Sequence, residues 1–187
     1  MIRQYFYNRM LRNNMPKEPR QKQLCSFDTA HHVGILFTTA DPDWKQEMSS
    51  ILNYLRTKRI RYTALGYLAQ HNISEDDCLS VCQYFSSKDV TWMRTPKQHT
   101  LAYKFMLQQF DMLINCASAE TDILQYIMHV SPTNFKIGTK HGSMRTAPYD
   151  LMLDLPERNG IRPFFDVLKV YLPMLCPDNS KPEKNIV

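Results

Sequence analysis

A short phrase that occurs twice constrains the fold of this chain more than any other feature. Residues 110–116 and 149–155 each run an aromatic residue, an aspartate, a stretch of mostly apolar residues, and then a polar residue. An apolar run this short, with polar residues on both sides, is typical of a strand buried on both faces. Such strands belong to sheets covered by helices, so the phrase predicts an α/β fold.

The rest of the chain alternates between strand and helix patterns. Strands are predicted at 33–37, 62–68, 90–93, 110–116, 134–138 and 149–155, and helices at 44–55, 74–85, 118–130 and from 162 to 171 or slightly beyond. Asp43 is the predicted N-cap of the first helix, with Gln46 completing a capping-box pair. The alternation predicts a single three-layer domain with a mainly parallel sheet of five to six strands, Rossmann-like or flavodoxin-like.

The orientation of the last strand is the open question of this topology. Residues 139–148 alone join the last two predicted strands, and they carry no helical face. A parallel crossover usually needs about a dozen residues or more. We therefore expect an antiparallel last strand, which would make the sheet mixed. The alternative is a long loop that still crosses over.

Composition predicts one domain in a reducing compartment. The chain has 187 residues, of which 43% are hydrophobic, enough for a full-sized core. Its apolar runs are too short to span a bilayer, and its N-terminus shows no signal-peptide pattern. The 5 cysteines have no paired spacing, as expected for reduced thiols. We expect a cytoplasmic protein with an arm at 1–23, a domain at 24–177 and a polar tail at 178–187.

The excess positive charge lies in the N-terminal arm. Of the 23 basic and 18 acidic residues, residues 1–23 hold six basic and one acidic, so the remaining 17 of each cancel. The basic residues of the arm are Arg3, Arg9, Arg12, Lys17, Arg20 and Lys22. A basic arm favours an acidic partner, such as RNA, a ribosome, an anionic membrane surface or an acidic protein. The alternative is a helix packed on its own domain with its arginines facing water.

A candidate ligand site follows from the predicted topology. In open α/β sheets, ligands bind at the carboxyl ends of the strands. The polar residues expected there are Thr38, Thr39, Asp41, Asn115, Lys140 and His141. The loop after Thr38 leads into the N-terminus of a helix, which is a favourable site for an anion. This loop lacks the glycine that close approach of a phosphate normally requires. Plain loop and cap roles are the alternative, and Asp111 and Asp150 are expected to be turn or cap residues at the opposite edge.

Motifs that would name a reaction are absent from the sequence. It has neither of the glycine-rich phosphate-binding motifs and no nucleophile elbow. Cys78 and Cys82 could share a metal with His71, but the spacing matches no standard zinc site. We therefore predict no catalytic residue, no metal and no cofactor.

Five segments resemble a known family when taken in order behind a basic arm. They are VGILF at 33–37, LGY at 65–67, FDMLI at 110–114, FKIG at 135–138 and YDLML at 149–153. Together they resemble an uncharacterised family of short bacterial proteins known only as a domain of unknown function, which brings no catalytic residues. Residues 110–138 are also similar to part of the N-terminal half of heptosyltransferase-like glycosyltransferases. Those enzymes use a second nucleotide-sugar domain for which this chain has no room, so catalysis is not implied.

Two functional hypotheses follow from the sequence. The first is a non-catalytic interaction or accessory protein that docks to an acidic partner through its basic arm. The second is a binder or enzyme for a phosphorylated or nucleotide small molecule in the cleft at the carboxyl ends of the strands. The fold class alone does not decide between them.

Overall fold

The computed structural model describes residue 9 and residues 20–68, 78–117, 121–140, 147–155 and 160–176. Within these residues, six strands form one sheet in the order β3-β2-β1-β4-β5-β6, and every neighbouring pair is parallel. The strands are β1 (His32–Thr38), β2 (Arg61–Leu68), β3 (Gln83–Ser86), β4 (Met112–Asn115), β5 (Phe135–Thr139) and β6 (Leu151–Leu153). The helices are α2 (Trp44–Thr57), α3 (Leu101–Leu107), α4 (Asp122–Val130) and α5 (Ile161–Leu175), with a short 3-10 helix η2 (Ser87–Asp89). The predicted single α/β domain is confirmed.

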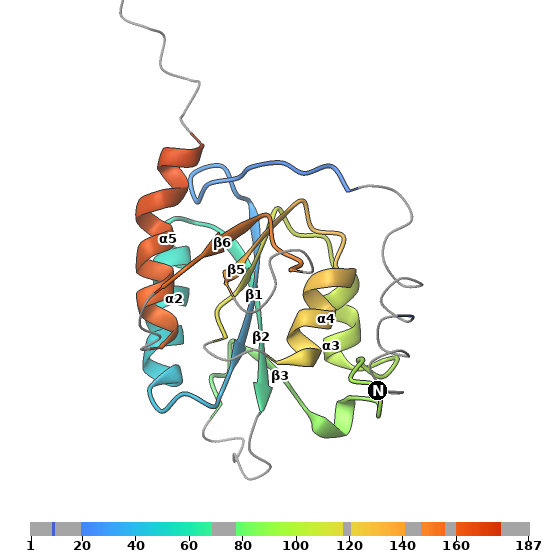
Figure 1. Cartoon of the computed structure of the whole chain (residues 1–187). Coiled ribbons are helices and arrows are strands. Elements are labelled where there is room, and N and C mark those ends of the chain that lie inside the picture. The colour runs from blue at the N-terminus through green and yellow to red at the C-terminus, as the bar shows by residue number, and fades with distance from the viewer. Residues whose placement is uncertain are drawn as a thin grey trace, which may run out of the picture.

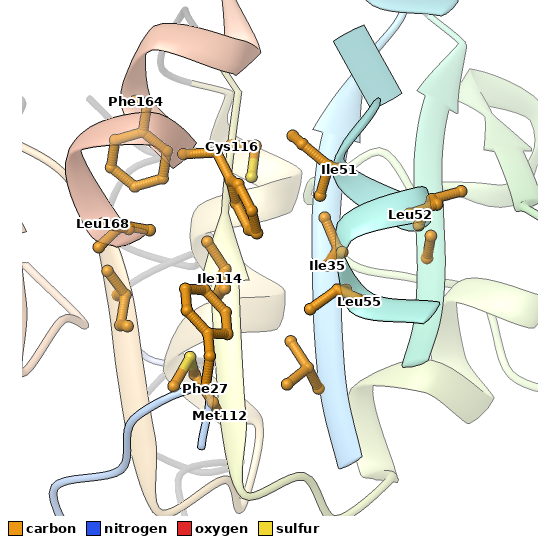
Figure 2. Close-up of a cluster of buried hydrophobic side chains, with 14 of the residues drawn as sticks. Phe27, Ile35, Ile51, Leu52, Leu55, Met112, Ile114, Cys116, Phe164 and Leu168 are labelled. Atoms are coloured by element: carbon orange, nitrogen blue, oxygen red, sulfur yellow. The ribbon is translucent and has the colours of Figure 1, made fainter. Parts of the chain in front are cut away.

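The sheet is the middle layer of three. Helices α2 and α5 cover one face, and α3 and α4 cover the other (Figure 1). Successive residues of β1 point to opposite faces, so Ile35 belongs to the α2–α5 core and Leu36 to the α3–α4 core. Figure 2 shows Ile51 and Leu55 of α2 beside β1 in the first of these cores. Because both faces are buried, the strands read as continuous apolar runs rather than as alternating ones.

Helix α2 matches its sequence pattern along its length but not at its start. Its predicted apolar positions, Trp44, Met48, Ile51, Leu52 and Leu55, are all buried. Asp43 precedes the helix, but its side chain makes no capping hydrogen bond, so the predicted pair with Gln46 is wrong. The backbone of Asp43 has φ −97° and ψ 10°, outside the extended region from which an N-cap side chain reaches back to the first turn.

The segment between β2 and β4 differs most from the prediction. A helix was predicted at 74–85, but the last residues of that range belong to strand β3. Residues 69–77 lie outside the described part of the chain. Phe85 is 2% exposed and pairs with Tyr67 of β2, so sheet pairing and burial override the local helical pattern. The strand predicted at 90–93 is a single bridge from Val90 to Pro96, and α3, capped by Thr100, was not predicted.

The last strand is parallel, so the expectation of an antiparallel edge was wrong. Two contacts set its direction. The Asp150 N–H donates to the Lys136 carbonyl at 2.8 Å, and an Asp150 carboxylate oxygen accepts from the Lys136 N–H at 2.9 Å. These contacts place the start of β6 beside the start of β5. The parallel register then follows, with Ile137 opposite Leu151.

The repeated segment, residues 110–116 and 149–155, has the same structural role at both positions. Asp111, just before β4, accepts from the amides of His31 and His32 at 2.8 and 2.9 Å and donates its own N–H to the His32 carbonyl. Asp150 makes the equivalent exchange with Lys136. Each aspartate therefore clamps the first residues of the neighbouring parallel strand, at the amino-terminal edge where we expected turn or cap roles.

The aromatic residue of each phrase lies over a glycine of the clamped strand. A Cβ on Gly34 would lie 2.9 Å from a ring carbon of Phe110, and a Cβ on Gly138 would clash with the ring of Tyr149. Gly34 follows His32 by two residues, and Gly138 follows Lys136 by two. The two strand pairs are thus built on one plan, with the aromatic ring taking the space that a side chain would fill.

Replacing Asp150 by asparagine should destabilise the domain by about 3 kcal/mol, because it leaves a largely buried guanidinium without its counter-charge. Arg20 donates two hydrogen bonds of 2.6 Å to this carboxylate, and the two side chains are 17% and 9% exposed. Urea unfolding measures the change. The matched control is Asp154→Asn, which removes the 70%-exposed partner of Lys140 and should cost less than about 1 kcal/mol. Equal losses in the two variants would contradict the clamp.

Candidate functional site

The predicted site residues at the ends of β1 and β4 lie at the point where the strand order reverses. This point lies between β1 and β4, and it is where open sheets of this strand order bind ligands. Thr38 ends β1, Asn115 ends β4, and Lys140 follows the next strand, β5. Thr39 is buried beside Thr38, and Asp41 is half-buried in the following loop. His141 lies outside the described residues.

The buried polar side chains at this edge make hydrogen bonds within the domain. The Thr38 hydroxyl accepts from the Ala40 N–H at 3.3 Å, and the Thr39 hydroxyl donates to the Tyr67 carbonyl at 3.4 Å. The Asn115 side chain is 5% exposed, and its carbonyl oxygen accepts from the Ala117 N–H at 3.2 Å. These bonds hold the loops after β1 and β4 in place.

Tyr149 is a central residue of this edge that the ligand-site prediction missed. Its hydroxyl accepts from the amides of Asn115, at 2.8 Å, and Gln125, at 2.9 Å. It thereby links the end of β4 to helix α4 while its ring covers Gly138. The sequence signal was its place in the repeated phrase, but the contact with Asn115 joins residues 34 positions apart.

Carboxylates dominate the helix N-termini on the α2–α5 side. Asp41 and Asp43 precede α2, and Glu47 lies in its first turn. Glu47 accepts from the Ile161 N–H at 2.7 Å, so it caps α5 from a different helix. Gly160, just before α5, has φ 103°, and a Cβ there would clash with the Glu47 carboxylate. Protein carboxylates therefore occupy the region that a bound phosphate would favour.

The cysteine that follows β4 is in an environment that makes its thiol unreactive. Cys116 is 2% exposed, and burial, with a smaller effect from Glu47, raises the pKa of its thiol far above the ordinary value. A protonated, enclosed thiol is a poor nucleophile. Within the described ranges, no three His, Cys, Asp or Glu side chains are grouped as a metal site would require.

Two described cations of the predicted arm, Arg20 and Lys22, contact the amino-terminal edge of the sheet. Beyond its pair with Asp150, Arg20 donates to the carbonyls of Thr133 and Asn134 at 3.1 Å each. Lys22 lies 3.3 Å from the same carboxylate and is 72% exposed. Arg9 is exposed, whereas Arg3, Arg12 and Lys17 lie outside the described residues. The end of the arm is thus fastened to the start of β5 and β6.

The same edge buries a lysine that the site prediction did not consider. Lys136 is 2% exposed, and its ammonium group donates to the His129 carbonyl at 3.3 Å. Burial, followed by repulsion from Arg20, lowers its pKa to about 7, although Asp150 opposes the shift. Asp150 itself is partly buried, which raises its pKa, but the bonds from Arg20 and the Lys136 amide outweigh this and lower the pKa overall.

The low pKa of Lys136 should make stability rise with pH. The unfolded lysine keeps its proton until about pH 10.4, so between about pH 7 and that value the unfolded chain binds more protons and folding is favoured as pH rises. We expect the wild-type protein to gain about 2 kcal/mol over Lys136→Met between about pH 6 and 8.5. Urea unfolding across this range measures the difference. Lys45→Met, at an exposed lysine of α2, is the control and should follow the wild type. Parallel pH curves for wild type and Lys136→Met would contradict the shift.

Comparisons with known proteins identify a family and no activity. Within the described residues, no helix has the length and apolar character needed to cross a bilayer. No curated protein and no solved structure matches the chain, so the similarity to heptosyltransferase-like enzymes and the bacterial source stay predictions. The model of a family described as a family of unknown function, DUF6913, matches residues 3–175. That match spans most of the chain, and the chain therefore belongs to this family of unknown function.

Proposed function

We propose that this protein is a non-catalytic cytoplasmic interaction protein, and that it docks to an acidic partner through the cations of residues 1–19. The observation that carries the proposal is the attachment of the arm: Arg20 and Lys22 hold its end against Asp150. A charged segment fastened to a rigid domain at one end loses less freedom on binding than a free chain.

The state of the strand-end residues favours this function over catalysis. The side chains of Thr38 and Asn115 accept hydrogen bonds from the loops that follow their strands, and the Thr39 hydroxyl donates to Tyr67 of β2. The Cys116 thiol is protonated and enclosed. The arm, by contrast, has Arg3, Arg9, Arg12 and Lys17 against a single acid before Arg20. RNA, a ribosome, an anionic membrane surface and an acidic protein all offer the negative charge that such a segment binds.

Neutralising the arm should weaken binding to one polyanion class. Arg3→Gln/Arg9→Gln/Arg12→Gln should lose about tenfold or more in affinity, because each cation near a polyanion contributes electrostatic binding energy. Fluorescence anisotropy measures binding of the full-length chain to labelled single-stranded RNA and to poly-glutamate, and co-sedimentation measures binding to phosphatidylserine vesicles.

The control variant Lys45→Gln/Arg56→Gln/Arg59→Gln removes the same charge from α2 and the turn that follows it. It should bind as the wild type does. Equal loss in both variants, or no binding to any probe, would exclude arm docking. Substitution is preferable to deletion of residues 1–23, because that deletion also removes Arg20 and so breaks its pair with Asp150.

A second candidate function has its own supporting observation. The strand order places the reversal point between Thr38 and Asn115, with Lys140 one strand further along the same edge. We propose as the alternative that a phosphorylated or nucleotide small molecule binds there. Its negative groups would have to lie towards Lys140 and away from Asp41 and Glu47, since like charges repel.

A thermal-shift screen tests this alternative on the purified protein. Nucleotides, nucleotide sugars and phosphorylated metabolites are the probes. A ligand at about 100 times its Kd stabilises by about 2.7 kcal/mol, which moves the midpoint by several degrees. The shift should shrink in Lys140→Gln and persist in the control Lys45→Gln, since both lysines are exposed. A flat response to the whole panel would exclude the alternative.

A further inference from the structure

A cavity of about 520 Å³ opens on the α3–α4 face, and none of its described lining residues belongs to the predicted ligand site. Its walls are the loop after η2 on one side and helices α3 and α4 on the other. The apolar part of its lining is Met93, Pro96, Met106, Leu107 and Val130, joined by the rings of Tyr103 and Tyr126. The volume lies in the range of cavities that hold ligands or inserted side chains, about 300–1,000 Å³.

The loop that forms one wall is shaped in advance. The Thr91 N–H donates to the Thr95 carbonyl at 2.8 Å, and the two hydroxyls of these threonines lie 2.8 Å apart. Lys97 then donates its N–H to the Asp89 carbonyl at 2.8 Å. Arg94, at the turn, has φ 63°, a conformation that the surrounding bonds must hold in place for a residue with a side chain. The loop wall of the cavity is therefore held in place by its own hydrogen bonds.

The turn displays a large apolar side chain to solvent. Trp92 is 66% exposed, and Leu107, on the opposite wall, is 54% exposed. Tryptophan and arginine are the residues most enriched among those that dominate protein–protein binding energy, and here Trp92 and Arg94 lie on one tight turn. Exposed apolar groups on both sides of an apolar cavity favour a partner that buries them together.

The surroundings of the cavity are positively charged. Lys97 lines the cavity, and the elements that form or adjoin its walls carry Lys88 in η2, Arg94 in the loop and Lys104 in α3. Within the described part of the chain none of these four cations pairs with an acid. Lys97 donates to the Lys88 carbonyl at 2.6 Å, a bond that leaves its charge uncompensated. The nearby Asp89 carboxylate is held by the Ser86 N–H at 2.9 Å. An occupant of this groove has to bring negative charge.

We infer that this groove binds an acidic peptide segment of a partner protein. Apolar side chains of the segment enter between the loop and α3, and its carboxylates meet Arg94, Lys97 and Lys104. Methionine, leucine and valine linings adapt to apolar side chains, whereas a groove for nucleic acid relies on stacking aromatics along a basic path. The basic arm of this chain is disfavoured as an occupant, because its cations would face those of the groove. No described residue of the arm lines this groove, so the inference goes beyond the proposed function.

Anisotropy with a labelled acidic peptide tests the inference on the full-length chain. The probe combines Asp and Glu with Leu and Phe at helical spacing; a second probe has serine in place of Leu and Phe, and a third is single-stranded RNA of equal charge. The acidic apolar peptide should bind, the serine peptide should bind about tenfold more weakly, and acrylamide quenching of Trp92 should fall on binding.

Matched substitutions locate the site. Leu107→Ser and Arg94→Gln/Lys104→Gln should each weaken peptide binding about tenfold. The control for Leu107→Ser is Val170→Ser, at a 55%-exposed residue of α5. The control for the double variant is Arg59→Gln/Lys45→Gln. Like the test variant, it changes one arginine with a positive φ, here 58°, and one lysine in a helix. The controls should bind normally, and so should the Arg3→Gln/Arg9→Gln/Arg12→Gln variant, which separates this result from the test of arm docking.

Three outcomes overturn the inference. The first is no peptide binding, or equal loss in test and control variants. The second is RNA binding that exceeds peptide binding and is lost in the groove variants, which would assign the groove to nucleic acid. The third is a rise of about tenfold in peptide affinity when Tyr5, Phe6 and Tyr7 become serine, which would assign the groove to the arm of this chain.

Discussion

The hydrogen bonds that an aspartate carboxylate accepts from backbone N–H groups at the start of a neighbouring strand underlie the rest of this structure. Parallel strands are joined by long crossovers, so no tight turn sets their register. Asp111 supplies that register for β1 and β4, and Asp150 supplies it for β5 and β6. Once these pairs are aligned, Gly34 and Gly138 lie beneath the aromatic rings that need their space. A shift by one residue would send every buried side chain to the wrong face of the sheet.

The two clamps share a plan but differ in charge. At Asp111 the clamped strand begins with His32, and the pKa of this histidine is lowered by burial and by Arg61, so it is favoured in its neutral form. At Asp150, Arg20, Lys22 and Lys136 surround one carboxylate. Three cations cannot all be balanced by one anion, and the most buried of them, Lys136, gives up its proton most easily. The end of the basic arm is therefore part of the fold.

Much of this fold could be predicted because buried strands and amphipathic helices carry strong local patterns. The apolar face of α2 and the runs of β1 and β4 are examples. Strand β3 has four residues, of which only Phe85 is buried, and α3 is seven residues long, so neither presents enough periods to be recognised. The direction of β6 depends on the contacts of Tyr149 and Asp150 with β5, which no local pattern records. The predicted topology was enough to place Thr38 and Asn115 at one edge of the sheet. The hydrogen bond from Asn115 to Tyr149 joins distant parts of the sequence, so it could not be predicted from local patterns.

The acylation rate of the buried lysine at the start of β5 reports how often the domain opens locally. A neutral amine is the reactive form of lysine towards acylating reagents, and near neutral pH a large part of Lys136 is in that form. Its side chain is nevertheless shut inside the protein. Acylation at this position can therefore proceed only from molecules in which the amino-terminal edge has opened. The ratio of the acylation rate of Lys136 to that of the exposed lysines therefore measures the frequency of local unfolding at the amino-terminal edge of the sheet.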